Sequence, residues 1–298
     1  MWRVLDISGD NYYLCVKNNN FSVVQENQEK LHCLFEDINT IILYGNNITI
    51  TNTCIQKCLE HKVPVIFCDK TYMPSGMLLS AWTTNIYGQR LQLQINTPKP
   101  KIKQAWQQII TNKLNNQAEV LKKFTAGNAA NIIFDMAKQV RSGDASFKEG
   151  VGAKVYFENL FSCFYRNAKG EDIINAALNY GYAIARSSVA RAVVSSGLNP
   201  AISVFHSENH NPFCLIDDLI EPFRPAVDLI VKEKEEFFRK EKELSPIAKK
   251  ELASLVESNL YFEDDAYSFG AGILKYVQSY VSFLSQETDK INFPKILK

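Results

Sequence analysis

The chain has 298 residues, of which 46% are hydrophobic and 22% charged, and its formal net charge is +1. This composition predicts a globular protein with a substantial core and excludes a uniformly basic chain, although a local basic patch can be concealed in a balanced total. No apolar run approaches the roughly 18 residues that a membrane span requires, and the segment MWRVLDISGD lacks the layout of a signal peptide. We therefore expect a cytoplasmic protein with no membrane contact.

Strands and short turns dominate the first part of the sequence. Apolar β-branched residues flank a Gly-Asn-Asn turn within 41–50, a short helix is expected over 51–61, and VPVIFCD is typical of a buried strand. The segment NTPKPK, at 96–101, then interrupts the pattern with two prolines. We place a domain boundary there and expect a β-rich domain over 1–98.

The seven cysteines are odd in number and irregularly spaced, so we expect them to be reduced and buried. Cys54, Cys58, His61 and Cys68 lie close together in the sequence, which raises the alternative of a zinc site. Their spacing, C-x3-C-x2-H-x6-C, departs from the paired C-x2-C of common structural zinc sites. Buried cysteines in a core are therefore the favoured interpretation.

Helical periodicity dominates the remainder, 99–298. Apolar residues recur at helical spacing in AWQQIITNKLNNQAEVLKKF, and a long segment of small residues from Glu171 ends at Gly197. Two further helices are expected in EPFRPAVDLIVKEKEEFF and DDAYSFGAGILKYVQSYVSFL. The predicted fold class is α+β, with a small N-terminal β-rich domain followed by a larger all-α domain that carries the catalytic site.

Positive charge is concentrated at the start of the helical part. Residues 99–154 contain ten Lys and Arg against four acids. An ordinary lysine-rich surface and a nucleic-acid contact both agree with this count.

Glu149 is a candidate metal ligand at the start of a predicted helix. Small residues follow it, which allow a phosphate or a metal to approach closely, and Lys148 and Lys154 bracket it with positive charge. A structural alternative stays open, because acids favour the first turn of a helix and Ser146 is positioned to act as its cap.

A histidine and a carboxylate cluster follow further along the chain. His206 ends an extended segment, and Asp217, Asp218 and Glu221 fall within one turn of the next predicted helix. One imidazole nitrogen with carboxylate oxygens is a ligand set that suits magnesium or manganese. The alternative is a salt bridge between Glu221 and Arg224.

Several segments together resemble a known family. These are KEGVGAKVYFENLF, NAALNYGYAIARSSVARAVVSSGLNPAISVFH, NPFCLIDDLIEPFRPAVDLIV and VPVIFCD. They are similar to the CRISPR-associated spacer integrases, in the branch that accompanies a single large RNA-guided effector nuclease (type II). The resemblance covers essentially the whole chain, and DLIEPFRP is its most distinctive part.

The resemblance implies one divalent ion, Mg²⁺ or Mn²⁺, bound by three catalytic residues in the helical domain. Matched motif by motif, these are Glu149, His206 and Glu221, with Asp218 as a possible auxiliary ligand. His210 matches no ligand position.

The implied reaction is a transesterification, in which the 3′-hydroxyl of a short double-stranded DNA fragment attacks a phosphodiester at the edge of a CRISPR repeat. Four basic residues are candidate DNA contacts because of their charge and their position in the sequence: Lys148, Lys154, Arg186 and Arg191. The alternatives are a structure-specific nuclease of DNA repair and a non-catalytic DNA-binding scaffold.

The resemblance also implies an assembly. Members of the family form homodimers through the β-rich domain, and two such dimers flank a small ferredoxin-like adaptation partner. Contact with the RNA-guided effector nuclease is a further expectation.

Overall fold

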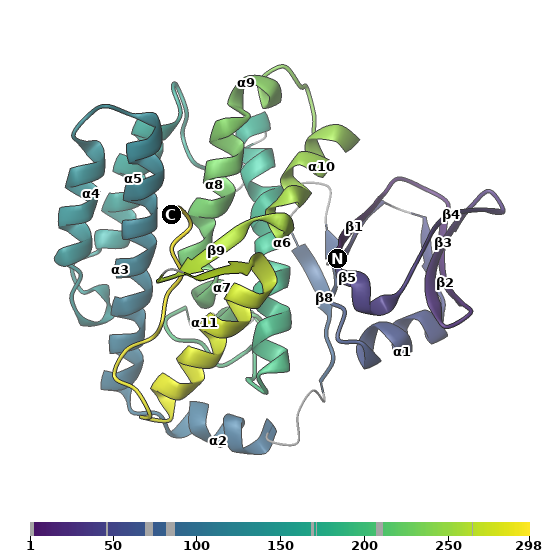
Figure 1. The fold of residues 1–298 in the computed structure, drawn as a ribbon, viewed down its shortest axis with the longest axis horizontal. Helices are drawn as coiled ribbons and strands as arrows, with labels where there is room; N and C mark the ends of the chain where they lie inside the picture. Colours follow the sequence, from purple (N-terminus) through teal and green to yellow (C-terminus); the bar gives the residue numbers. More distant parts are fainter. Residues whose placement is uncertain are drawn as a thin grey trace.

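The structure is a computed structural model, and it describes residues 3–45, 47–68, 74–81, 87–167, 170, 172–206, 211–263 and 265–298. Strands dominate the N-terminal part and helices dominate the rest (Figure 1), as the α+β expectation required. The N-terminal strands are β1 Arg3–Ser8, β2 Tyr12–Lys17, β3 Asn20–Gln25, β4 Gln28–Cys33, β5 Ile38–Tyr44, β6 Ile48–Ile50, β7 Val65–Cys68 and β8 Pro74–Leu78. A hairpin of β9, Asn259–Phe262, and β10, Asp265–Ser268, adds two strands to the otherwise helical part.

Two of the described helices, α3 (Lys99–Phe124) and α6 (Ile173–Ser195), are much longer than the others. They are α1 Asn52–Glu60, α2 Tyr87–Asn96, α3 Lys99–Phe124, α4 Ala129–Lys138, α5 Lys148–Leu160, α6 Ile173–Ser195, α7 Cys214–Leu219, α8 Arg224–Glu233, α9 Glu235–Phe238, α10 Pro246–Ala253 and α11 Phe269–Leu284. None of these helices combines the length and the apolar character that crossing a membrane would demand.

The N-terminal strands form two sheets, of order β1-β5-β7-β8 and β4-β3-β2-β6. In the first sheet, β1, β5 and β7 run parallel, and both faces are covered. Ile41 and Leu43 of β5 point into a small core shared with the second sheet, whereas Ile42 between them joins the large core of the helical part. This alternation follows from the two-residue period of a strand.

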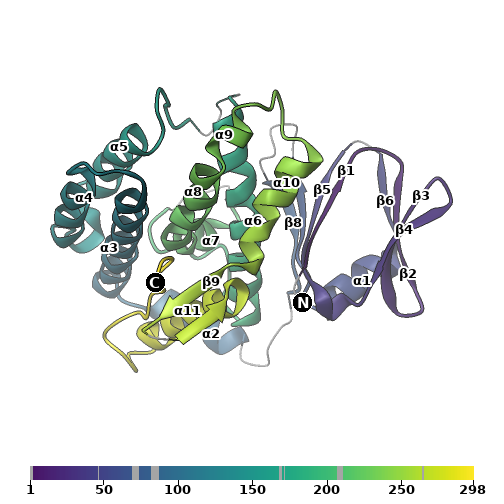
Figure 2. The same ribbon diagram turned by 45° about the horizontal axis from the view of Figure 1, so that its top comes forward.

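The first sheet is attached to α6. Figure 1 and Figure 2 both place β1 and β5 beside α6, with α3, α4 and α5 on the opposite side of α6 and α8. The Thr40 and Ser187 hydroxyls are 2.9 Å apart, and Arg191 donates to the Ile38 carbonyl at 2.9 Å. These contacts join the β-rich part to α6 of the helical part.

The proposed boundary near residue 98 coincides with the start of α3, but α2 lies before it. The side chain of Gln94, in α2, donates to the Asn199 carbonyl at 3.1 Å and accepts from the Asn199 backbone N–H at 2.8 Å. These bonds attach α2 to the helical part. The division into 1–98 and 99–298 therefore remains a prediction about folding units.

The cysteines that raised the alternative of a zinc site are reduced thiols, and two of them are core residues. Cys54 and Cys58 are buried in the smaller core and are free thiols, and α1 is capped by the Thr51 hydroxyl. His61 Nδ1 lies 3.1 Å from Glu36 Oε1. Among the described residues, no group of His, Cys, Asp and Glu that includes these cysteines is placed to hold a metal ion.

Candidate metal and catalytic site

Glu149 and Glu221 converge on one cation, the ammonium group of Lys113. Lys113 Nζ lies 2.7 Å from Glu149 Oε1 and 2.5 Å from Glu221 Oε2. The three side chains are 8%, 25% and 5% exposed, for Lys113, Glu149 and Glu221. Lys113 comes from the middle of α3, Glu149 from the first turn of α5, and Glu221 from the short 3-10 helix Glu221–Phe223 before α8. Two predicted ligands from distant parts of the sequence are thus neighbours.

Glu221 also forms the salt bridge that the sequence offered as an alternative. Arg224 Nε donates to Glu221 Oε1 at 2.8 Å, and the Arg224 guanidinium stacks over the Tyr182 ring at 4.8 Å. Burial alone would raise the pKa of Glu221, but the charges of Arg224 and Lys113 outweigh it and hold that pKa at about 2. Glu221 is therefore ionised at neutral pH.

The start of α5 is fixed by Asp144. Its carboxylate accepts from the backbone N–H of Lys148 at 2.9 Å and from that of Glu149 at 3.0 Å. The expected Ser146 cap is wrong, because the Ser146 hydroxyl is buried without a hydrogen-bond partner. Gly143 and Asp144 both have positive φ, so the chain reverses here and turns the Asp144 carboxylate toward the helix.

Gly152 lets α5 approach α3 closely enough for Glu149 to reach Lys113. A Cβ at Gly152 would lie 2.4 Å from a methyl group of the fully buried Leu114, whereas a Cβ at Gly150 would meet nothing within 4 Å. We expect Gly152→Ala to lower the free energy of unfolding by about 1–3 kcal/mol, and Gly150→Ala to leave it unchanged or to raise it by up to about 1 kcal/mol. Urea titration of both variants measures the difference. Equal effects would show that the close packing is not needed.

His206 is oriented by Asp218. The imidazole Nδ1 lies 2.6 Å from Asp218 Oδ1, and Asp218 Oδ2 accepts from the backbone N–H groups of Val204 and Phe205, both at 2.7 Å. Asp218 is fully buried. Both of its oxygens are engaged, and Nε2 is the ring nitrogen that does not face Asp218.

Aromatic rings and carboxylates surround the His206 imidazole. It meets the Trp106 ring edge-on with centroids 5.4 Å apart. The Phe205 ring stacks on the same Trp106 ring with centroids 4.6 Å apart. The hydrogen bond that the imidazole donates to Asp218 outweighs burial and raises the pKa of His206, and the charges of Asp218, Glu149 and Glu221 add to this effect.

The other predicted residues are placed differently. Asp217 receives a bidentate contact from Arg186 at 2.6 and 2.9 Å. Arg191 is bound to the sheet, as described above. Lys154 is exposed on α5, 3.9 Å from a glutamate one turn later, and Lys148 is half-buried. His210 lies outside the described residues.

The chemical types of the three candidate ligands suit a hard divalent cation. The set contains two carboxylates and an imidazole whose Nδ1 is held by another carboxylate, an arrangement common around metal sites. Glu221 Oε2 is buried and its partner is the Lys113 ammonium at 2.5 Å, so this oxygen already faces a cation. Across the described ranges, however, no three His, Cys, Asp or Glu side chains already surround a common point, and the Lys113 ammonium stands between the carboxylates.

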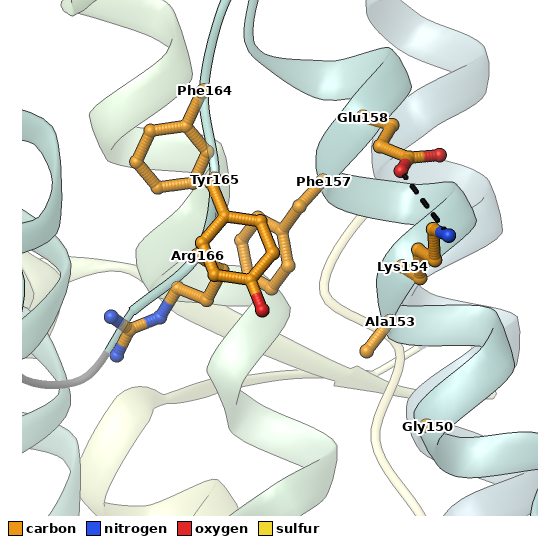
Figure 3. A pocket seen from close by; sticks show the side chains of 8 residues that line it. All are labelled: Gly150, Ala153, Lys154, Phe157, Glu158, Phe164, Tyr165 and Arg166. Carbon is orange, nitrogen blue, oxygen red and sulfur yellow. Dashed lines mark ion pairs between the residues drawn. The ribbon is translucent and has the colours of Figure 1, made fainter.

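A hollow of about 260 Å³ lies along α5, beginning at Gly150, next to Glu149. Figure 3 shows the Phe157 and Tyr165 rings on one side of this hollow, Lys154 across from them, and the Arg166 guanidinium below. Tyr165 is 82% exposed. The Arg166 guanidinium is already bonded to two asparagine side chains, at 2.6 and 2.7 Å, so the exposed ring and Lys154 are the groups suited to stacking on a base and contacting its phosphate.

Comparisons with known proteins identify the family of this chain. A family profile described as "CRISPR associated protein Cas1" matches residues 5–238. A CRISPR-associated endonuclease Cas1 from Neisseria meningitidis serogroup C (strain 8013) is 35% identical over 277 residues, covering 92% of this chain and 90% of the relative.

Solved structures share the fold. A casposase bound to an integration product superposes with a TM-score of 0.83 at 20% identity, covering 98% of this chain and 93% of that chain. A CAS1 protein from Thermotoga maritima gives 0.77 at 17% identity, covering 96% and 97%. The fold is thus of the class that Cas1 proteins and casposases share. The chain belongs to the CRISPR-associated protein Cas1 family, which confirms the resemblance seen in its sequence.

Proposed function

We propose that this protein is an integrase and endonuclease of CRISPR adaptation, acting in the prokaryotic cytoplasm. The 3′-hydroxyl of a short double-stranded DNA fragment attacks a phosphodiester at the edge of a CRISPR repeat, and the 3′-hydroxyl of the repeat strand leaves. The 35% identical relative is named an endonuclease, and the casposase of similar fold was solved with an integration product. The observation that carries the proposal is the convergence of Glu149 and Glu221 around one cation.

The cofactor of this reaction is one Mg²⁺ or Mn²⁺ ion, with Glu149, Glu221 and His206 as the residues that would hold it. When bound, such an ion lowers the pKa of the attacking hydroxyl and neutralises charge on the phosphate. Arg224 keeps Glu221 ionised and oriented. Asp218 orients His206 through Nδ1, and its fully engaged oxygens favour this role over ligation.

The DNA reaches the site along α5. Lys154, Lys148 and the hollow beside Glu149 supply positive charge and an exposed ring for the strand that carries the reacting end (Figure 3). Arg186 and Arg191 are engaged in internal contacts with Asp217 and Ile38, so we assign the strand contact first to the two lysines.

The assembly proposed for this chain is a homodimer, joined through the β-rich part, that flanks a small ferredoxin-like partner. A structure named Cas6-RT-Cas1–Cas2 complex contains a chain of the same fold, with a TM-score of 0.79 at 18% identity, covering 99% of this chain and 36% of that chain. A structure named TtCas1–DNA complex is similar at a TM-score of 0.55. Contact with an RNA-guided effector nuclease belongs to the same proposal.

A strand-joining assay tests the proposed reaction. Purified protein, with the small partner and Mg²⁺ or Mn²⁺, is incubated with a labelled fragment and supercoiled plasmid carrying a repeat. The expected result is covalent transfer of label to the plasmid, abolished by chelator and by a fragment with a 3′-deoxy end. Cleavage of branched DNA without any joining would favour a repair nuclease, and binding without either activity would favour a scaffold.

A further inference from the structure

Lys113 is an ionised side chain on a buried face of α3. That face is largely apolar, with Ile110 fully buried in the large core, but it also carries the buried amide of Gln117. The Lys113 ammonium forms ion pairs with two glutamates. Burial of a lone ammonium is costly, so a lysine at such a place requires compensating anions. The carboxylates of Glu149 and Glu221 provide them.

The four charged groups of the cluster balance. Two carboxylates, Glu149 and Glu221, face two cations, Lys113 and Arg224, and each oxygen–nitrogen contact is between 2.5 and 2.8 Å. Without Lys113, the two carboxylates would lie in a poorly solvated site with Arg224 alone and would repel each other.

A divalent ion cannot be added to this arrangement as it stands. Magnesium and manganese bind carboxylate oxygens at about 2.1 Å, and the Lys113 nitrogen already lies 2.7 Å from Glu149 Oε1 and 2.5 Å from Glu221 Oε2. An ion on the same two oxygens would stand against an ammonium of like charge. Lysine is a compact charge on a flexible four-carbon stem, so rotation about its side-chain bonds can withdraw the ammonium.

We propose that Lys113 is a tethered cation that occupies the metal position while the site is empty and competes with the divalent ion for Glu149 and Glu221. This inference rests on the proposed metal-dependent function and adds a residue that regulates metal binding. The lysine holds the two like-charged carboxylates together before metal binds. It also weakens metal binding, because the ion must first displace the ammonium. The site is therefore preformed and only moderately attractive to free divalent ions.

The test is the Mn²⁺ affinity of the full chain carrying Lys113→Met, which keeps the length of the side chain and removes its charge. Isothermal titration is expected to show binding at least about tenfold tighter than in the wild type. The melting temperature of the variant should fall in chelator and recover in Mn²⁺, because the ion replaces the missing charge. Lys122→Met, at an exposed position of α3, is the matched control and should change neither quantity.

The outcomes separate the possibilities. Equal or weaker Mn²⁺ binding by Lys113→Met would overturn the competition while leaving the metal site in place. Absence of Mn²⁺ binding in wild type and variant alike would sink the proposed metal site and the competition with it. Stability lost equally with and without Mn²⁺ would mean that Lys113 is only a structural ion-pair partner.

A second measurement needs no variant. In wild-type protein labelled with ¹⁵N-lysine, saturating Mg²⁺ should shift the Lys113 Nζ resonance and leave that of Lys122 in place. An unmoved Lys113 resonance, under conditions in which Mg²⁺ is bound, would contradict the displacement.

Discussion

Replacing Glu149 by glutamine is expected to reduce strand joining at least about 100-fold, the equivalent of roughly 3 kcal/mol in the barrier. Glutamine keeps the size of the side chain but removes one of the two anionic groups that hold the cation. Glu149 is a quarter exposed, and Lys113 retains Glu221 as a partner, so the protein should still fold. Initial joining rates in Mn²⁺ and melting temperatures in chelator measure the two effects separately.

Glu119→Gln is the matched control for this change. Glu119 is exposed on α3 and lies outside the cluster, so joining should stay within about twofold of the wild-type rate. If Glu149→Gln joined DNA at the wild-type rate, Glu149 would not be a ligand of the catalytic ion.

Replacing Asp218 by asparagine is expected to reduce both joining and Mn²⁺ affinity by about 10- to 100-fold, although Asp218 is not assigned as a ligand. An amide offers one acceptor oxygen where the carboxylate offers two. The backbone N–H groups of Val204 and Phe205 and the His206 imidazole therefore cannot all keep their bonds. The turn that carries His206 should loosen, and the pKa of His206 should fall because the bond that raises it is weakened.

Titration of the His206 ring by NMR distinguishes this role from a general loss of stability. Asp217→Asn, on the same helix, breaks the contact with Arg186 and should leave the pKa of His206 unchanged and joining well within tenfold of the wild-type rate. A His206 pKa that is the same in Asp218→Asn as in the wild type would show that Asp218 does not orient the imidazole.

Local rules were enough to predict many elements of the fold. The expected helix over 51–61 is α1, which begins after a Thr51 cap. The long helix expected to stop at Gly197 is α6, and Gly197 has the positive φ of a helix terminator. Each of these features depends on residues within a few positions of one another, which is the range that sequence patterns describe.

Pairing between distant strands was beyond those rules. The two apolar runs on either side of 45–47 are strands, as expected, but they do not pair with each other. β5 pairs with β1 and β7, whereas β6 lies beside β2 in the other sheet. Which partner a strand takes depends on the packing of the whole domain, and a three-residue turn does not determine it.

The candidate site was predicted in part. The ligand trio followed from the motifs that resemble the family, and the structure brings two of its members onto one cation. Lys113 was missed, although a lysine at helical spacing within the apolar face of AWQQIITNKLNNQ was a usable signal. The Asp144 cap was missed because it depends on a chain reversal at two residues with positive φ, which spacing alone does not reveal.

The central claim is that Glu149, Glu221 and His206 bind one divalent ion. Crystals grown with Mn²⁺ and measured for anomalous scattering test it most directly. We expect one strong Mn²⁺ peak in contact with both glutamate carboxylates and with His206 Nε2. A fully occupied Mn²⁺ peak elsewhere in the protein, with Lys113 still bound between the two glutamates, would contradict it.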